Sequence, residues 1–322
     1  MSGAARGTRR APSLCVERFL PGDRLGTYQI ERELGATRTS VLYQVAHLVL
    51  PRRAVLKVVH PQSQPRGVQL LREACIIAAL QHPGVPTLYE SGVLPDRRPW
   101  FVLERVEGQN LAEVIARGPM DPLEAGALVR DLADVLAHIH RRGVLQLGLR
   151  PDRILLTPER RFPLCIADWS EARTHDAPVV VPLAGTSSYH APEIRRGDAV
   201  DDRADVFALG VIGYMALTGV KPFPAGCTVH VPTRERCPTA PRELANLIDQ
   251  MLSPDRFDRP SAAEIHTELA EMVTDVIAVV ELPTAAAPVR IRKPKWTPAI
   301  PIFTTELDLG DLLPVEVDEG WD

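Results

Sequence analysis

Lys57 is the residue of this sequence whose chemistry most needs an explanation. It lies in the apolar segment 54–59 (Ala-Val-Leu-Lys-Val-Val), in a chain whose basic residues are otherwise almost all arginine. A charged side chain in such a segment needs a partner of opposite charge to offset the loss of its hydration. Glu73 follows sixteen residues later in the chain. We therefore expect these two side chains to form an ion pair.

Lys57 and Glu73 belong to a longer series of landmarks. The series runs through a glycine-containing loop at 34–43, Lys57, Glu73, a loop at 146–153, Asp168, and Ala-Pro-Glu at 191–193. Over roughly residues 24–275, its order and spacing resemble the signature of the eukaryotic-like (Hanks-type) Ser/Thr protein kinase family. The resemblance implies an α+β, bilobal protein-kinase fold, with a small β-rich N-lobe that has one helix and a larger helical C-lobe.

The same resemblance implies a cleft that binds ATP, with magnesium on the phosphates of the nucleotide. Asp168 stands at the position of the magnesium-binding carboxylate, and the hinge that receives adenine includes Glu104 and Val106. The residues that the resemblance places around the nucleotide are Gly35, Lys57, Glu73, Glu104, Val106 and Asp168.

The loop at 146–153 departs furthest from the family. Where kinases read His-Arg-Asp-Leu-Lys-Pro-x-Asn, this chain reads Gln-Leu-Gly-Leu-Arg-Pro-Asp-Arg. Gly148 stands at the position of the catalytic base, and Arg150 stands at the position that contacts phosphate. A positioned base contributes about 10²–10⁴-fold in rate, so we expect phosphate transfer to be absent or strongly impaired.

Arg153 stands where the family has the asparagine that holds the second magnesium. A guanidinium group has donors only, and its charge repels a metal ion. We hypothesise that Arg153 forms a salt bridge with Asp168 in place of a cation. Nucleotide binding would then be independent of metal, or would be prevented by the closed pair.

The loop at 34–43 keeps only the first glycine, Gly35, of the family's Gly-x-Gly-x-x-Gly. Thr37 and Ser40 carry side chains where the backbone must approach the phosphates closely. Their hydroxyl groups could donate hydrogen bonds to phosphate instead, and Arg38 could add a compensating charge. We therefore expect the binding of ATP and magnesium to be weakened.

Other landmarks support the fold rather than the reaction. Arg259 resembles the buried partner of Glu193, and Asp205 resembles the aspartate that holds the backbone of the catalytic loop. A buried ion pair is costly to break, which suits a role in the scaffold. The chain therefore retains the architecture of a kinase and loses its reacting groups.

Apolar periodicity predicts the elements that position these residues. Alternation predicts strands at 28–34, 41–46, 53–59, 88–93 and 100–104, and a helical period predicts one helix at 67–80. Later residues predict helices at 121–142, 205–217, 241–252 and 261–280, with a hairpin at 154–166. We divide the chain into a flexible arm (1–21), a kinase-like domain (22–280) with an N-lobe (22–104), a hinge (105–109) and a C-lobe (110–280), and a tail (281–322).

Composition argues against several classes of function. A formal net charge of −4 creates no field that would attract nucleic acid. The five cysteines form no Cys-x-x-Cys pair, which argues against a disulfide framework or a thiolate metal site and favours a reducing cytoplasm. The longest apolar run, 206–217, is too short to span a bilayer, so we expect no membrane association.

The tail is proline-rich from Leu282 and acidic after Trp296. Its acidic and apolar residues alternate, a pattern that suits docking on a protein partner, with solvated disorder as the alternative. Thr304 followed by Leu307 resembles the sequence that forkhead-associated domains read once the threonine is phosphorylated.

These observations favour a bacterial pseudokinase that acts as a nucleotide-responsive regulator or scaffold in signalling. Its expected partner is a protein, such as an active kinase or a forkhead-associated domain. The alternative is a weak or atypical ATP-dependent Ser/Thr kinase that uses Lys57, Asp168 and Arg150, with solvent or Asp152 accepting the proton. A third interpretation is a cleft that binds no nucleotide and serves only for protein interaction.

Overall fold

The computed structural model describes residues 18–37, 39–61, 67–176, 188–223 and 229–279, with side chains described as far as residue 272. These residues belong to one unit of the chain, which ends at Val279. The second unit, 280–322, lies outside the described residues, and so do most of the predicted arm, Arg38, and the predicted recognition sequence at Thr304 and Leu307.

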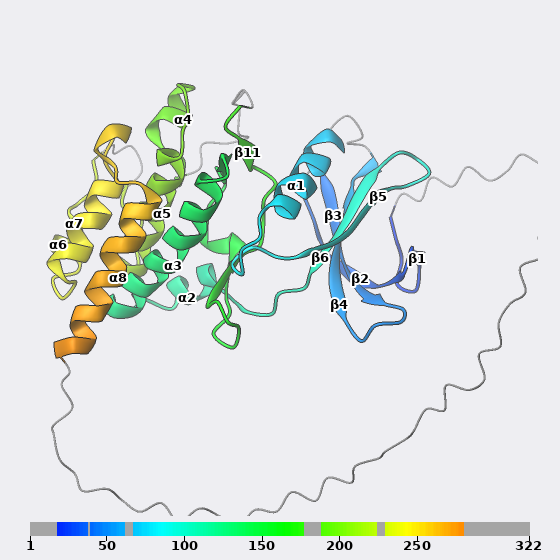
Figure 1. The fold of residues 1–322 in the computed structure, drawn as a ribbon, viewed down its shortest axis with the longest axis horizontal. Coiled ribbons are helices and arrows are strands. Elements are labelled where there is room, and N and C mark those ends of the chain that lie inside the picture. Colours follow the sequence, from blue (N-terminus) through cyan, green and yellow to red (C-terminus); the bar gives the residue numbers. More distant parts are fainter. Residues whose placement is uncertain (1–17, 38, 62–66, 177–187, 224–228, 280–322) are drawn as a thin grey trace, which may run out of the picture. The chain divides into compact units, whose positions relative to one another are not determined.

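An antiparallel sheet of six strands forms the N-lobe, in the order β1-β2-β3-β4-β6-β5 (Figure 1). Its strands are β1 (Arg24–Leu25), β2 (Tyr28–Ala36), β3 (Ser40–His47), β4 (Arg53–Val59), β5 (Leu88–Val93) and β6 (Pro99–Glu104). The five predicted strands are confirmed. Strand β1 was not predicted, because a strand of two residues is too short to show a periodicity.

Two apolar clusters pack on the sheet, and the second of them fixes the position of the N-lobe helix. Tyr28, Tyr43 and Leu56 come from successive strands and form an apolar cluster with exposures of 1 % or less. The predicted helix is confirmed as α1 (Gly67–Ala79), and its Ile77 belongs to the same apolar cluster as Phe101 of β6. This packing holds α1 against the sheet that carries Lys57.

Helices build most of the C-lobe. They are α2 (Leu111–Ala116), α3 (Pro122–His140), α4 (Pro192–Arg196), α5 (Arg203–Thr218), α6 (Thr233–Arg236), α7 (Arg242–Met251) and α8 (Ala262–Val279). The four predicted helices are confirmed as α3, α5, α7 and α8, with ends within two residues of those expected. Helices α2, α4 and α6 were not predicted, because they are too short to show a helical period.

The two central helices follow from their local sequences. Asp121 accepts a hydrogen bond from the N–H of Leu123 at 2.8 Å, and Pro122 opens α3, so the predicted N-terminus is confirmed. Helix α5 is buried on nearly all sides, as its uniformly apolar sequence predicted. It packs against both α3 and α7 and so anchors the C-lobe.

Short strands carry the loops that face the cleft. One small sheet contains β7 (Gln109–Asn110), β9 (Ile154–Leu156) and β10 (Leu164–Ile166), and another pairs β8 (Val144–Leu145) with β11 (Arg173–Thr174). The predicted hairpin is the β9–β10 pair, with Leu164 opposite Leu156. The loop at 146–153 connects β8 to β9 and ends in a 3₁₀ helix, η2 (Pro151–Arg153), and Asp168 follows β10.

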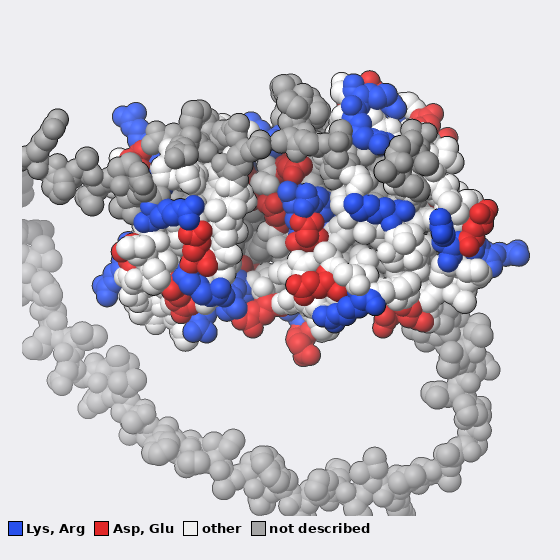
Figure 2. All heavy atoms as spheres, turned by 180° about the vertical axis from the view of Figure 1, so that it is seen from behind, with Lys and Arg blue, Asp and Glu red and all other residues white. Residues whose placement is uncertain are grey.

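The surface of the described residues is mixed in charge. On the face seen in Figure 2, basic and acidic side chains alternate, and neither sign forms a continuous field. Within the described ranges, every helix is too short or too polar to cross a membrane. The same part of the chain contains no group of three or more His, Cys, Asp and Glu residues that could hold a metal ion.

Candidate functional site

The ion pair predicted between Lys57 and Glu73 is confirmed. Lys57 Nζ lies 2.7 and 2.8 Å from the two carboxylate oxygens of Glu73, and the two residues are 7 % and 4 % exposed. Burial lowers the pKa of Lys57, but the carboxylates of Glu73 and Asp168 raise it more, so that the pKa lies above its ordinary value. The N-lobe therefore presents a cation to the cleft.

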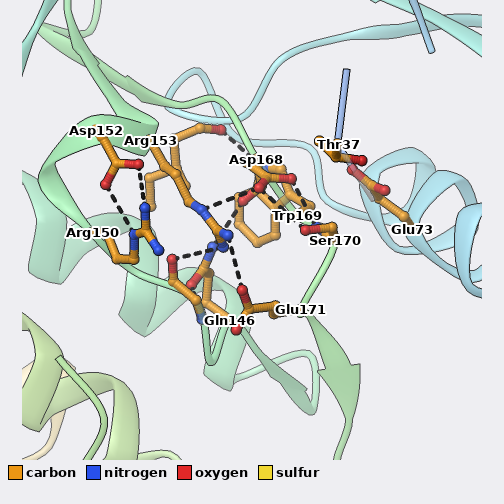
Figure 3. A network of polar contacts seen from close by, with 12 residues as sticks. Thr37, Glu73, Gln146, Arg150, Asp152, Arg153, Asp168, Trp169, Ser170 and Glu171 are labelled. Atoms are coloured by element: carbon orange, nitrogen blue, oxygen red, sulfur yellow. Dashed lines mark hydrogen bonds and ion pairs between the residues drawn. The ribbon is translucent and has the colours of Figure 1, made fainter. Parts of the chain in front are cut away.

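Asp168 faces the cleft from the C-lobe, and its carboxylate is surrounded by donors (Figure 3). Oδ1 accepts a hydrogen bond from the N–H of Ser170 at 3.1 Å and lies 3.6 Å from Lys57 Nζ, and Oδ2 lies 3.2 Å from the Ser170 hydroxyl. Burial raises the pKa of Asp168, but Lys57, Arg153 and the Ser170 N–H together lower it more. The side chain is therefore ionised, with both oxygens in use.

Trp169 stays out of the cleft. Its side chain is fully buried in the main apolar cluster, and its indole N–H donates to the carbonyl of Ile166 at 2.8 Å. The backbone N–H of Trp169 hydrogen bonds to Glu73. The indole ring, at the position of the phenylalanine in the family's Asp-Phe-Gly, thus anchors the Asp168 segment.

Asp205 holds the backbone of the catalytic loop, as predicted. It is 0 % exposed and accepts hydrogen bonds from the N–H groups of Gln146, at 2.8 Å, and Leu147, at 2.7 Å. His140 Nε2 lies 2.9 Å from the same carboxylate. Leu147 has a φ of +57°, a strained value for a branched residue, so these hydrogen bonds must maintain the turn.

The predicted salt bridge between Arg153 and Asp168 is confirmed. Arg153 Nε lies 3.2 Å from Asp168 Oδ2, and Nη2 lies 2.9 Å from Glu171 Oε1 (Figure 3). The remaining nitrogen, Nη1, donates to the carbonyl of Gly148 at 3.2 Å. The guanidinium group of Arg153 therefore contacts Gly148 at the base position, Asp168 at the metal-ligand position, and Glu171.

Gly148 is small enough to admit this guanidinium. A Cβ atom at position 148 would lie 2.5 Å from Arg153 Nη1 and 3.1 Å from Glu171 Cβ, and the first distance is too short for any real Cβ contact. Arg153 thus fills the space in which the side chain of a catalytic aspartate would begin. The two departures from the kinase pattern form one coupled change.

Arg150 and Asp152 are engaged with each other. Arg150 Nε lies 2.9 Å from Asp152 Oδ1, and the second arm of the guanidinium contacts Oδ2, so the pair is bidentate. Hydrogen bonds from Arg150 hold the pKa of Asp152 below its ordinary value. Contact of Arg150 with phosphate stays a prediction, and Asp152 is a weaker base than an unpaired aspartate.

The glycine-rich loop closes on itself. Thr37 Oγ1 accepts hydrogen bonds from the N–H groups of Thr39, at 3.2 Å, and Ser40, at 3.0 Å, and lies 3.0 Å from the Ser40 hydroxyl. The Thr37 hydroxyl also donates to the carbonyl of Ser40 at 3.2 Å, so it has partners within the turn. A hydrogen bond from this hydroxyl to phosphate stays a prediction. Gly35 has open space around it, which a Cβ would enter without a clash.

The hinge presents backbone rather than side chains to the cleft. The Glu104 carboxylate is held by Arg160, at 3.0 Å, and by the hydroxyl of Thr87, at 3.3 Å, so that this side chain serves the scaffold. Within the described residues, the backbone N–H and C=O of Val106 have no hydrogen-bond partner. Val106 can therefore offer one donor and one acceptor to the edge of a base.

Magnesium does not fit the residues that the family uses to hold it. Mg²⁺ takes oxygen ligands, yet the position of the asparagine that holds the second magnesium carries the guanidinium of Arg153. Both oxygens of Asp168 already accept from Ser170 and face Lys57 or Arg153. A metal ion would have to displace a bound cation, which the local charge opposes.

Glu171 and Gln146 have roles in the site that were not predicted from the sequence. Glu171 pairs with Arg153, and its other oxygen lies 3.9 Å from His190. Gln146 donates from Nε2 to the carbonyl of Asp168 at 2.9 Å and accepts from the N–H of Gly148 at 2.6 Å. An acidic residue three positions after Asp168 was the one available signal for Glu171, because its partner comes from another loop.

The scaffold pair is also confirmed. Arg259 binds Glu193 through two parallel hydrogen bonds of 2.6 and 2.9 Å, and the residues are 1 % and 2 % exposed. Such bidentate geometry is the strongest form of an arginine–carboxylate contact. The residues at 185–187, before this pair, lie outside the described part of the chain.

Comparisons with known proteins agree with this fold. The protein kinase domain family model matches residues 28–269. The Ser/Thr-protein kinases pkn2 and pkn3 of Myxococcus xanthus are 28 % and 30 % identical, over 76 % and 74 % of this chain, and PrkC of Bacillus subtilis is 28 % identical over 76 %. This chain covers only 32 %, 48 % and 40 % of the lengths of those three relatives.

A solved structure supports the same fold. The PknI kinase domain of Mycobacterium tuberculosis aligns with a TM-score of 0.64 and 24 % identity, and the alignment covers 79 % of this chain and 99 % of that domain. Identity at this level shows the fold alone. Because the family match extends over well more than half of the sequence, this chain belongs to the protein kinase domain family.

Proposed function

We propose that this chain is a pseudokinase, a kinase-fold protein that transfers phosphate poorly or not at all and acts as a nucleotide-responsive regulator or scaffold. The observation that carries the proposal is the guanidinium of Arg153, which fills the space of the missing base side chain at Gly148. A substrate hydroxyl at this position would meet a cation in place of a proton acceptor. The loss of a positioned base raises the barrier by about 3–5 kcal/mol.

The ordered scaffold also supports a binding role. The ion pairs of Lys57 with Glu73 and of Glu193 with Arg259 are buried and complete, and Asp205 keeps the catalytic loop in place. A cleft with these features can bind a ligand without turning it over. The hinge at Val106 offers the donor and the acceptor that adenine requires.

An atypical Ser/Thr kinase is the second candidate, and the comparisons favour it. The relatives that match this chain are named as Ser/Thr protein kinases. Lys57, Glu73 and Asp168 are also arranged as a kinase needs them. In this case solvent would have to accept the proton, because Asp152 is bound to Arg150.

Phosphate transfer from ATP labelled at the γ-phosphate separates these candidates. The purified chain is incubated with magnesium or manganese, with and without a generic Ser/Thr substrate, beside a Lys57→Ala variant and an active Ser/Thr kinase. We expect incorporation no higher than that of Lys57→Ala. Incorporation on Ser or Thr that Lys57→Ala abolishes would establish the atypical kinase and overturn the pseudokinase.

A protein partner completes the proposal. An active kinase, or a forkhead-associated domain that reads phosphorylated Thr304, would receive the signal. Binding of such a domain to a tail peptide phosphorylated at Thr304, with the unphosphorylated peptide as control, tests the second of these partners. Equal binding of the two peptides would rule out phosphothreonine recognition.

A further inference from the structure

We infer that Arg153 takes the place of the divalent cation in this cleft, so that the site accepts the triphosphate of an adenine nucleotide without a metal ion. The inference rests on the proposed function, because it assigns a ligand and a binding mode to the same cleft.

Geometry places Arg153 where a cation would act. Its Nε lies 3.2 Å from Asp168 Oδ2, on the carboxylate that a kinase uses for its phosphate-bridging magnesium. Ser170, at the position of the glycine in the family's Asp-Phe-Gly, adds a hydroxyl at 3.2 Å from the same oxygen. Asp168 therefore has its charge balanced and its lone pairs filled by the chain itself.

Because Gly148 has no side chain, there is room for the Arg153 guanidinium at the base position. Arg153 Nη1 would lie 2.5 Å from any Cβ at position 148, so the guanidinium can adopt this place only beside a glycine. Glu171 holds the other arm at 2.9 Å. The guanidinium is thus fixed from three sides, and its position does not depend on a ligand.

Unused donors remain for phosphate oxygens. Arginine has five N–H bonds and lysine has three. Arg153 contacts three acceptors, and Lys57 makes two hydrogen bonds to Glu73 while Asp168 lies 3.6 Å away. Arg153 and Asp168 expose 17 % and 29 % of their side chains, so a ligand in the cleft can reach them.

Local charge also reduces the need for a metal ion. The cations Lys57 and Arg153 face the carboxylates of Glu73, Asp168 and Glu171, which leaves one net negative charge. The kinase pattern of one lysine, one glutamate, two aspartates and one asparagine carries two net negative charges. At the same five positions, the charges of Lys57, Glu73, Gly148, Arg153 and Asp168 sum to zero. The added positive charge is a guanidinium, which binds phosphate through a planar fork.

Calorimetric titration of ATP into the full chain, once in excess EDTA and once in millimolar magnesium chloride, tests the inference. We expect the two dissociation constants to agree within about threefold. Binding that occurs only with magnesium, or no binding in either condition, would overturn the inference. The wild-type comparison decides the matter even where a variant proves unstable.

Variants then assign the effect to Arg153. We expect Arg153→Asn to weaken binding in EDTA by about tenfold or more, and Arg196→Asn, in an exposed pair on α4, to leave it unchanged. The double variant Gly148→Asp/Arg153→Asn should bind only with magnesium. Undiminished affinity of folded Arg153→Asn in EDTA would contradict the inference. Phosphate transfer by the wild-type chain would instead contradict the proposed function, so the two failures are distinguishable.

Discussion

The two walls of the cleft have diverged from the kinase pattern to different degrees. The N-lobe wall keeps its charged pair, Lys57 with Glu73, at 2.7 Å and in a buried setting. The C-lobe wall keeps Asp168 but replaces the catalytic base with Gly148 and the second metal ligand with Arg153. The retained contacts hold parts of the protein to each other. The changed residues, which include Thr37 and Ser40 of the N-lobe loop, lie where the family contacts the phosphates or the reacting hydroxyl.

This difference between the walls is informative because the loss of a buried scaffold contact and the change of a residue that faces the cleft cost different amounts of folding free energy. Breaking a buried pair in the scaffold leaves a charge without a partner, and this destabilises the whole fold. Changing a residue that faces the cleft costs little stability, provided that its neighbours can compensate. Arg153, Gly148 and Glu171 compensate one another, so the C-lobe wall could change without loss of the fold.

The scaffold pair should show the largest effect on stability. Arg259→Ala leaves the Glu193 carboxylate buried without its partner, and we expect the free energy of unfolding to fall by about 3–5 kcal/mol, measured by urea denaturation. Arg196→Ala removes an exposed arginine that pairs with Asp198 and should cost about 0–1 kcal/mol. Similar losses in both variants would show that Glu193 and Arg259 have no special role.

Loss of Asp205, which anchors the catalytic loop, should have the second largest effect on stability. Asp205→Ala removes the acceptor of two buried backbone N–H groups, from Gln146 and Leu147, and we expect a loss of about 2–3 kcal/mol. Asp205→Asn keeps one acceptor oxygen and should lose less. Hydrogen exchange of the two amide protons provides the local measurement. Unchanged protection in Asp205→Ala would remove Asp205 from its assigned role.

Disturbing the contact between Gly148 and Arg153 in the C-lobe wall should have a smaller effect on stability. Gly148→Ala forces the Arg153 guanidinium away from its acceptors, and we expect a loss of about 1–2 kcal/mol. The same substitution in an Arg153→Asn background should cost less, because the obstructing group is gone. A double-mutant cycle measures this difference. Additive effects would mean that the two positions changed independently.

Acid sensitivity should be the smallest of these effects. Lys57 and Arg153 hold the pKa of Asp168 below its ordinary value. Its ionisation therefore adds stability above the unfolded pKa of ~3.9, and this stability is lost as the pH falls through the lower folded pKa.

In Arg153→Asn the folded pKa of Asp168 should move towards the ordinary value. Stability should then fall less steeply below about pH 4 than in the wild-type chain. Urea midpoints measured across that range, with Arg196→Asn as the matched control, provide the comparison. Parallel pH profiles for the three proteins would indicate that Arg153 does not act on Asp168.

Sequence alone was sufficient for the fold and for the identity of the altered positions. Periodicities of two and of 3.6 residues are local properties, so they predicted the strands of the N-lobe sheet and the long helices α3, α5, α7 and α8. Strands of two residues and helices of four to six residues, such as β1, α2, α4 and α6, contain too few repeats for either period to appear. The landmarks also predicted four contacts between distant residues, which are Lys57 with Glu73, Arg153 with Asp168, Glu193 with Arg259, and Asp205 with the backbone of the catalytic loop.

Only the tertiary structure decided how the altered residues share space. Sequence could suggest that Arg153 faces Asp168, but not that its guanidinium occupies the volume above Gly148 or that Glu171 holds its other arm. Nor could sequence show that Trp169 is buried, or that Arg150 and Asp152 bind each other. The physical reason is that long side chains choose among rotamers by the acceptors that other loops bring near them. Those loops meet only when the chain has folded.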